Sequence, residues 1–151
     1  MAPTDRDLLL GLVGGIKWYD WDTDTDLSDW HGVKVNDQGR VVELDLSNRN
    51  LEGCIPSQLG HLKALEHLDL SDNKLNGSIP EALGDLDELK VLKLNKNKLT
   101  GDVPSSLGQL GNLEHLNLSS NRLSGECDVP SFLGQLGNLE HLNLAGNELS
   151  G

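Results

Sequence analysis

Residues 42–65 read VELDLSNRNLEGCIPSQLGHLKAL, and this pattern returns every 24 residues through the rest of the chain. The blocks EHLDLSDNKLNGSIPEALGDLDEL (66–89) and KVLKLNKNKLTGDVPSSLGQLGNL (90–113) follow in register. The fourth block (114–139) carries two extra residues, Glu126 and Cys127, and the fifth, EHLNLAGNELSG (140–151), stops halfway. A repeat period of roughly 20–50 residues is typical of coils that stack into a solenoid. The sequence therefore predicts four full coils and a truncated fifth.

Each repeated position has a physical role, which the second block illustrates. Leu68 and Leu70 alternate with polar residues, as in a strand with one buried side. Asn73 follows the strand, where an inward amide can bond backbone groups of its own coil and of the neighbouring coil. Pro80 sets the backbone angle at the start of an outer arm. The leucines of 83–89 then recur every third residue, as on one face of a short 3₁₀ turn.

The arrangement LxGxIPxxLGxLxxLxxLxLxxNxL closely resembles the plant-specific class of leucine-rich repeats, which also occurs in algal and bacterial proteins. The resemblance covers residues 42–151. It implies a right-handed α/β solenoid of 24-residue coils, with a parallel sheet on the concave face and short helical or 3₁₀ outer arms. It leaves the partner open, because the class serves receptors, inhibitors and intracellular scaffolds alike.

Residues 1–41 are predicted to form an N-terminal cap of a helix and a hairpin. Thr4-Asp5-Arg6-Asp7 fits a capping box with Asp in place of the usual Glu or Gln, and Gly14-Gly15 ends the helix. Lys34-Val35, the turn Asn36-Asp37-Gln38-Gly39 and the run from Arg40 to Leu46 favour a hairpin. The segment D-R-D…W…W…D-W-H-G-V resembles the cap of algal and bacterial leucine-rich repeat proteins.

The tryptophans and cysteines indicate how this cap is held and where the protein resides. Trp18, Trp21 and Trp30 are expected to seal the first coil by burial, because the cysteines that flank the similar plant caps are absent. Cys54 and Cys127 lie three coils apart, roughly 14 Å at ~4.8 Å per strand, which is too far for a disulfide. Free thiols favour a reducing compartment. The sequence therefore predicts a cytoplasmic location without a signal peptide.

Composition narrows the classes of function. The net charge is −12 and the pI is about 4.6, which argues against nucleic-acid or anionic-membrane partners, since phosphates need a basic face. Residues 20–31 begin like a calcium loop, but Thr25 stands where glycine is required and His31 replaces the bidentate Glu. No P-loop, nucleophile elbow or zinc-protease motif is present. We expect no enzyme, no cofactor and no metal.

Recognition is expected on the strands of the solenoid, whose outward side chains form columns across successive coils. In one column His115 and His141 stand ~5 Å apart, but Val91 interrupts the column and no third ligand completes a metal site. The predicted partner-binding residues are Glu43, Asp45, His67, Asp69, Asp72, Val91, Lys93, Asn95, Lys96, His115, Asn117, Ser119, His141 and Asn143.

The third coil concentrates positive charge. Lys90, Lys93, Lys96 and Lys98 are a third of the 12 basic residues, and the neighbouring coils carry acidic residues. Two explanations stay open. The lysines pair with carboxylates across strands, or they form a positive stripe that selects a carboxylate-bearing partner.

These observations predict a non-catalytic module that binds a protein or peptide through the strand face, of an immune or scaffolding kind. Two alternatives remain: the recognition segment of a larger signalling ATPase or GTPase, and an engineered scaffold. The near identity of 105–121 and 131–147 fits recent duplication or consensus design.

Three local expectations accompany this prediction. Arg49 stands where later coils have the inward Asn, so its guanidinium should turn towards the cap and the acidic 20–29 loop. Glu126-Cys127 should bulge out with an exposed thiol. The open C-terminal edge should favour end-to-end self-association.

Overall fold

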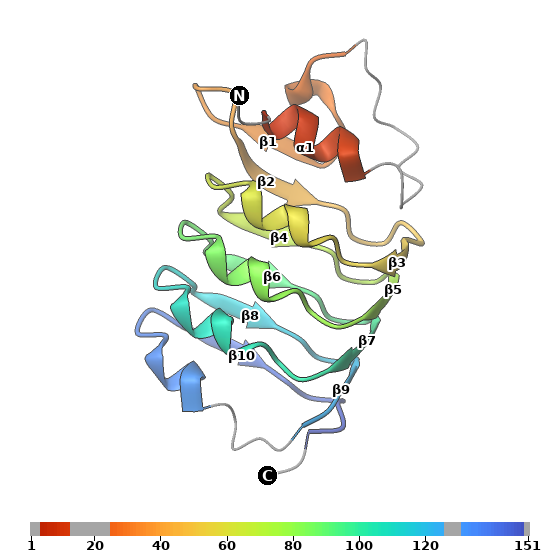
Figure 1. Cartoon of the computed structure of the whole chain (residues 1–151), viewed down its shortest axis with the longest axis vertical. Coiled ribbons are helices and arrows are strands. Elements are labelled where there is room, and N and C mark those ends of the chain that lie inside the picture. Colours follow the sequence, from red (N-terminus) through yellow and green to blue (C-terminus); the bar gives the residue numbers. More distant parts are fainter. Residues whose placement is uncertain (1–3, 13–24, 126–130, 150–151) are drawn as a thin grey trace.

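The structure is a computed structural model and describes residues 4–12, 25–125 and 131–149. It is a stack of coils, each with a strand on one side and a short 3₁₀ segment on the other (Figure 1). A six-stranded sheet runs through the stack in the order β1-β2-β4-β6-β8-β10. Its strands are β1 (Val33–Val35), β2 (Val41–Asp45), β4 (His67–Asp69), β6 (Val91–Lys93), β8 (His115–Asn117) and β10 (His141–Asn143). All neighbours are parallel except the antiparallel pair β1 and β2.

A second set of short parallel strands lines another edge of the stack. It consists of β3 (Glu52–Cys54), β5 (Lys74–Gly77), β7 (Lys98–Gly101) and β9 (Arg122–Leu123). The outer arms are 3₁₀ helices at η2 (Ser57–His61), η3 (Glu81–Asp85), η4 (Ser105–Gln109) and η5 (Ser131–Gln135). Pro56, Pro80 and Pro104 precede the first three arms with φ between −70° and −63°, which confirms the role predicted for this proline.

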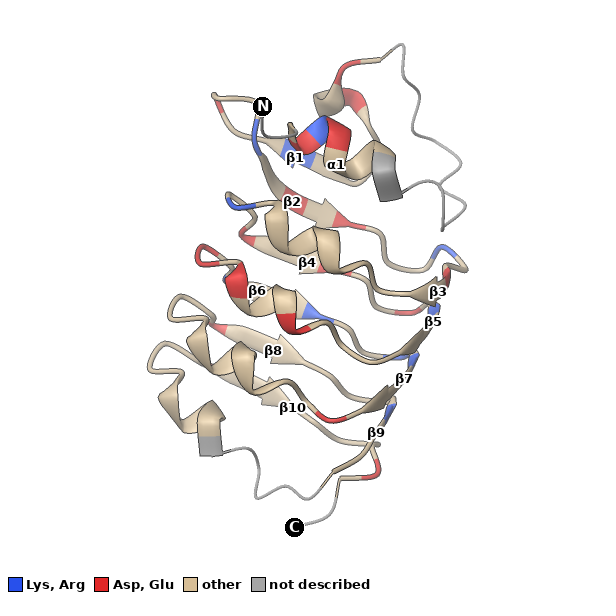
Figure 2. Ribbon diagram, viewed as in Figure 1, with Lys and Arg blue, Asp and Glu red and all other residues tan. Residues whose placement is uncertain are grey.

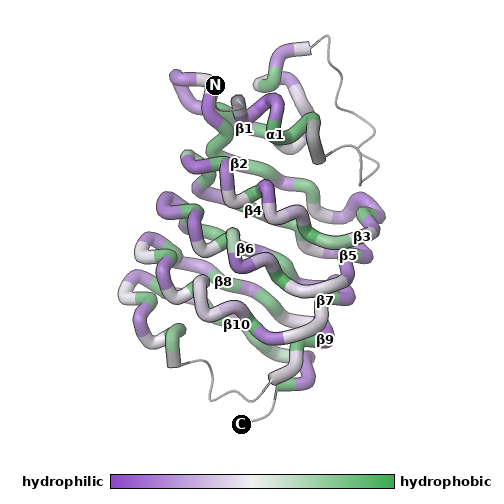
Figure 3. The backbone as a smooth tube through the Cα atoms, in the orientation of Figure 1, coloured by the Kyte–Doolittle hydropathy of each residue, from purple (hydrophilic) through white to green (hydrophobic). Residues whose placement is uncertain are grey.

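The leucines form one continuous core along the stack. Leu68, Leu92 and Leu116 pair in register and are all 0% exposed. Figure 3 shows hydrophobic stretches at matching places in successive coils and hydrophilic stretches at the turns. Burying one leucine side chain contributes about 1.5–3 kcal/mol. A single coil cannot bury its leucines alone, so the coils stabilise one another. The predicted solenoid is confirmed.

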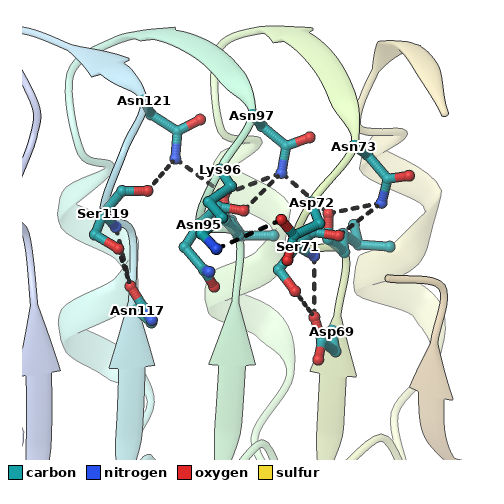
Figure 4. Close-up of polar contacts among 12 residues, drawn as sticks. Asp69, Ser71, Asp72, Asn73, Asn95, Lys96, Asn97, Asn117, Ser119 and Asn121 are labelled. Atoms are coloured by element: carbon teal, nitrogen blue, oxygen red, sulfur yellow. Dashed lines mark hydrogen bonds and ion pairs between the residues drawn. The ribbon is translucent and has the colours of Figure 1, made fainter. Parts of the chain in front are cut away.

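A ladder of asparagines ties each coil to the one before it (Figure 4). Asn121 is buried, and its Oδ1 accepts a hydrogen bond from the Leu99 N–H at 3.1 Å. Its Nδ2 donates to the carbonyls of Leu94, Leu118 and Ser119 at 2.9–3.2 Å. Asn73, Asn97 and Asn147 repeat these contacts in their own coils. The bridging role predicted for this position is confirmed.

The cap begins with α1 (Asp5–Leu12) and a short 3₁₀ turn, η1 (Leu27–Asp29). The predicted capping box is present, because the Asp7 N–H donates to Thr4 Oγ1 and the Thr4 N–H donates to Asp7 Oδ2. These hydrogen bonds with Thr4 lower the pKa of Asp7. The buried carboxylate of Asp5 accepts from Arg40 Nε at 3.0 Å and from the Val41 N–H at 2.8 Å. The helix is thereby fixed to the hairpin.

Two further expectations for the cap concern Trp30 and Arg49; the 20–24 part of the acidic loop, towards which Arg49 was also expected to turn, lies outside the described residues. Trp30 is 2% exposed, donates to Thr25 Oγ1, and lies under the guanidinium of Arg6. Arg49 reaches the cap, where its Nη2 lies 3.4 Å from the position that a Cβ on Gly32 would occupy. The tryptophan is therefore structural, and the first coil replaces the asparagine with an arginine directed at the cap.

Several sequence predictions fall outside the described residues. They concern Trp18 and Trp21, the helix end at Gly14-Gly15, the start of the calcium-like loop at 20–24, and Glu126-Cys127. Within the described ranges, no helix combines the length and apolar character needed to cross a bilayer.

Candidate functional site

The strand face, defined as the solvent-facing side of β2, β4, β6, β8 and β10, presents two columns of side chains in register. The strand pairings place the predicted residues opposite one another without a slip. The first column is Glu43, His67, Val91, His115 and His141, and the second is Asp45, Asp69, Lys93, Asn117 and Asn143.

An open depression of about 180 Å³ lies on this face across β2, β4 and β6. Six of the predicted residues line it: Glu43, Asp45, His67, Asp69, Val91 and Lys93. Leu44 and Leu68 also line it, and these two were missing from the sequence prediction. A leucine occupies their position in every coil, so the sequence held no signal that would single them out.

The other predicted residues lie beside the depression. His115, Asn117, His141 and Asn143 are on β8 and β10, the next two strands. Asp72, Asn95, Lys96 and Ser119 lie beyond the strand ends, in the turns that lead to the second sheet. Asp72 and Lys96 have φ of 57° and 58°, a left-handed backbone that side-chain-bearing residues seldom adopt.

Charge on the strand face changes sign along the stack. Carboxylates of Glu43, Asp45 and Asp69 stand on β2 and β4, whereas Lys93 stands on β6, one strand away from His115 on β8. Figure 2 shows the same change, with acidic residues on β2 and a basic residue on β6. The face is therefore acidic on β2 and β4 and carries one positive charge, Lys93, on β6.

Two of the four third-coil lysines pair with carboxylates as the charge-pairing explanation expects. Lys90 lies 3.7 Å from Glu66, and Lys96 lies 3.7 Å from Asp72. Within the described residues Lys93 makes no ion pair, although Asp69 is its register partner. The charge-pairing explanation thus accounts for Lys90 and Lys96 and leaves Lys93 facing solvent on the strand face.

A short polar turn closes the end of most strands. The Oδ1 of Asp69 accepts from both the N–H and the hydroxyl of Ser71, and Asn117 does the same for Ser119 at 3.0 and 2.7 Å (Figure 4). The pair Asp45 and Ser47 and the pair Asn143 and Ala145 repeat the backbone contact. An acceptor at this strand position therefore holds the turn two residues later.

The third coil breaks this pattern at Lys93. A lysine side chain has no acceptor, so the N–H of Asn95 lacks the bond that its counterparts make within the described residues. The Oδ1 of Asn95 is buried and, among the described residues, is without a hydrogen-bond partner. An unpaired buried polar atom costs stability. The third coil therefore carries a locally unfavourable arrangement beside Lys93.

Replacing Lys93 with asparagine is expected to stabilise the fold. The side-chain oxygen of the introduced asparagine would accept from the Asn95 N–H, as Asn117 does for Ser119. One restored hydrogen bond raises the free energy of unfolding by about 0.5–1.5 kcal/mol. Urea denaturation followed by circular dichroism measures the change. Lys98→Asn is the control, because Lys98 is an exposed lysine on β7 without such a turn. If Lys93→Asn raises the free energy of unfolding by no more than Lys98→Asn does, the missing hydrogen bond at the Asn95 N–H does not destabilise the third coil.

His115 and His141 lie side by side on β8 and β10. Their ring centroids are 5.3 Å apart and the rings are tilted by 45°. Partial burial, with Lys93 and His141 nearby, lowers the pKa of His115 below its usual value of 6.5. Within the described residues no three His, Cys, Asp or Glu side chains converge as metal ligands would. The pair can accept or donate hydrogen bonds to a ligand.

A larger hollow of about 530 Å³ lies where the cap meets the first coil. Its lining includes Arg6, Arg40 and Lys63. These cations are already used by the fold, since Arg40 bonds Asp5, Lys63 donates to a backbone carbonyl, and Arg6 donates to another. This hollow is part of the cap junction, and the strand face remains the better candidate site.

The register, the asparagine ladder and the coil length together define the architecture. The sequence profile of the leucine-rich repeat region family matches residues 37–150, which is more than half of the chain. The chain belongs to the leucine-rich repeat family. No curated protein sequence matches it significantly.

Solved structures with the same fold include plant receptor proteins. The BIR3–SERK2 complex from Arabidopsis thaliana aligns with a TM-score of 0.87 and 35% identity, covering 95% of this chain and 82% of the matched chain. The leucine-rich repeat ectodomain of the receptor kinase SOBIR1, also from Arabidopsis thaliana, aligns at 0.83 and 31%, covering 100% and 83%. The plant peptide hormone receptor RGFR1 in complex with RGF2 aligns at 0.72 and 39%, covering 80% and 22%.

The cytoplasmic location predicted from the cysteines is wrong. The similar structures include ectodomains, the extracellular parts of receptor kinases, and SOBIR1 matches over the whole chain. This similarity indicates an extracellular location. The prediction failed for a physical reason. Cys54 lies exposed on β3, and no other cysteine belongs to the described residues, so its free thiol carries no information on the compartment.

Proposed function

We propose that this chain is a non-catalytic extracellular module that binds a protein or peptide through the strand face. The observation that carries the proposal is the register of two polar columns around the depression on β2, β4 and β6. Proteins with the same fold supply support, because RGFR1 is seen in complex with RGF2 and BIR3 with SERK2. The outer arms lie across each coil from these strands, so the columns face solvent.

The change of charge along the stack restricts the partner. A cationic group of the partner fits over Asp45 and Asp69, and an anionic group fits over Lys93 and the histidine pair. Two strand spacings of ~4.8 Å separate Asp45 on β2 from Lys93 on β6, which is roughly 10 Å. A peptide in the polyproline II conformation covers about this distance in three residues at ~3.1 Å each, and its three residues per turn place both side chains on the same face. The partner we propose therefore carries a basic residue followed by an acidic residue three positions later, or the reverse order if it runs the other way.

Peptide selection followed by charge reversal tests this proposal. We expect peptides selected from a random displayed library to be enriched either in the basic-x-x-acidic pattern or in its reverse, but not in both. Lys93→Glu should weaken their binding at low salt by roughly tenfold or more, about 1.4 kcal/mol, and leave the melting temperature nearly unchanged. Lys98→Glu makes the same change of charge on β7 and should alter the affinity less than about twofold.

Two outcomes would contradict the proposal. Selected peptides could bind the Lys93→Glu variant as tightly as the original chain. Alternatively, Glu81→Lys on the outer arm η3 could weaken binding more than the change on the strand face. Fluorescence polarisation with labelled peptides measures both affinities.

The alternatives from the sequence receive no specific support. The end-to-end self-association through the C-terminal edge stays a prediction. It is supported by β10, an edge strand within the described ranges on which Leu142 is 42% exposed.

A further inference from the structure

The chain contains two Asn-x-Ser sequences, which are acceptors for N-linked glycans in secreted proteins. They are Asn76-Gly77-Ser78 and Asn117-Leu118-Ser119. The similarity to receptor ectodomains makes this modification relevant to the chain. The motif alone does not separate the two asparagines, but their surroundings in the folded coils differ sharply.

Asn76 is well placed to carry a glycan. It lies on β5 in the second sheet, and both Asn76 and Ser78 are exposed. Within the described residues the Asn76 side chain makes one hydrogen bond, a weak one of 3.6 Å that its Oδ1 accepts from the Cys54 thiol. The Nδ2 that would carry the sugar therefore donates to no acceptor in the described part of the chain. Figure 1 shows β5 at a different edge of the stack from β4 and β6.

Asn117 is poorly placed to carry a glycan. It lies in β8, between Lys93 on β6 and Asn143 on β10, each one strand spacing of ~4.8 Å away. Its side chain is half-buried, and its Oδ1 accepts from both the N–H and the hydroxyl of Ser119. A sugar on Nδ2 would stand between the flanking side chains and would cover the part of the strand face around Lys93.

We propose that Asn76 carries an N-linked glycan and that Asn117 does not. The donor is an oligosaccharide on a lipid pyrophosphate. The bond between sugar C1 and the pyrophosphate oxygen breaks, a bond between C1 and Asn76 Nδ2 forms, the lipid pyrophosphate leaves, and one amide proton passes to a base of the transferase. The sugar is transferred during synthesis, before the chain has folded. Chains whose glycan fits the folded coils then reach the native state, and the other modified chains do not. A glycan on β5 stays in solvent, whereas one on β8 crowds the sheet.

Site-specific mass spectrometry tests the proposal. The whole chain is directed by an added leader into the secretory pathway of a eukaryotic cell, and the secreted folded protein is treated with a glycosidase that converts glycosylated asparagine to aspartate. We expect conversion at Asn76 and none at Asn117. Asn76→Gln and Ser78→Ala should each give an unmodified chain of native stability, because both side chains are exposed. An unmodified original chain, or a glycan on Asn117, would overturn the proposal.

The inference is independent of the peptide proposed as partner. The glycosylated chain and the Asn76→Gln variant should bind a selected peptide with affinities within about twofold of one another, because Asn76 is absent from the lining of the depression. A large difference between the two would overturn the placement of the glycan away from the binding face. Failure to select any peptide would count against the proposed function and would leave the glycan assignment standing.

Discussion

Replacing Asn121 with leucine should lower the free energy of unfolding by about 3 kcal/mol or more. Leucine has a similar shape but can neither accept from the Leu99 N–H nor donate to the carbonyls of Leu94, Leu118 and Ser119. Each buried group left without a partner costs about 1–3 kcal/mol. The contacts lie in two successive coils, so their loss weakens the interface between coils as well as one turn. Equilibrium urea denaturation followed by circular dichroism gives the value.

Asn112→Ala is the control for this variant. Asn112 also donates from its side chain to a backbone carbonyl of the previous coil, that of Asp87 at 2.9 Å, but the bond is exposed to solvent. Water replaces an exposed bond, so a loss below about 1 kcal/mol is expected. If the two variants lose similar free energies of unfolding, burial of the asparagine hydrogen bonds does not determine how much they stabilise the fold.

Replacing Gly84 with alanine should cost about 2–3 kcal/mol, near the upper end of the usual overpacking range. Gly84 is buried in η3, against η4 of the next coil. A Cβ on Gly84 would lie 2.5 Å from the carbonyl oxygen of Ser106 and 2.6 Å from its Cβ. These atoms belong to or adjoin the backbone, so the two outer arms must move apart. The midpoint of urea denaturation should fall accordingly.

Gly111→Ala provides the matched change. Gly111 lies in the following coil, is exposed, and would place its new Cβ more than 4 Å from any other described group. Its φ is not in the left-handed region, so alanine adds no strain there. The variant should therefore be neutral or gain about 0.4–1 kcal/mol through the unfolded chain. A loss as large as that of Gly84→Ala would mean that close packing of the outer arms does not limit the residue at position 84.

The stacking of the chain could be predicted from the sequence because the same leucine and asparagine positions have the same structural roles in every coil. Leu68 and Asn73 recur with a fixed spacing, and stacking of the coils buries the leucine and gives the asparagine amide its hydrogen bonds. The columns of the strand face followed from the same register. Alternation along a strand is a property of the backbone, so the residues that point outward can be assigned from the order of the amino acids alone.

Other features left no comparable signal in the sequence. Asn48, Asp72, Lys96 and Ser120 all adopt a left-handed backbone, yet they share no side-chain chemistry. The geometry is imposed by the turns on either side of them. The second sheet, whose strands have two to four residues, was not predicted from the sequence. The unpaired Oδ1 of Asn95 depends on which atoms surround it, and a single sequence does not contain that information.

The asparagine ladder also favours an order in which the coils fold, from the N-terminus to the C-terminus. Asn73 closes the turn of the first coil by accepting from the N–H groups of Arg49 and Leu51, and Asn121 does the same for Leu99 of the third. A coil is thus completed only by the coil that follows it. Because a ribosome releases the chain from its N-terminus, each new segment emerges beside a surface whose open groups it fits. The coils can therefore fold one after another from the cap, each on the surface of the coil before it. The chain does not have to search for its final topology.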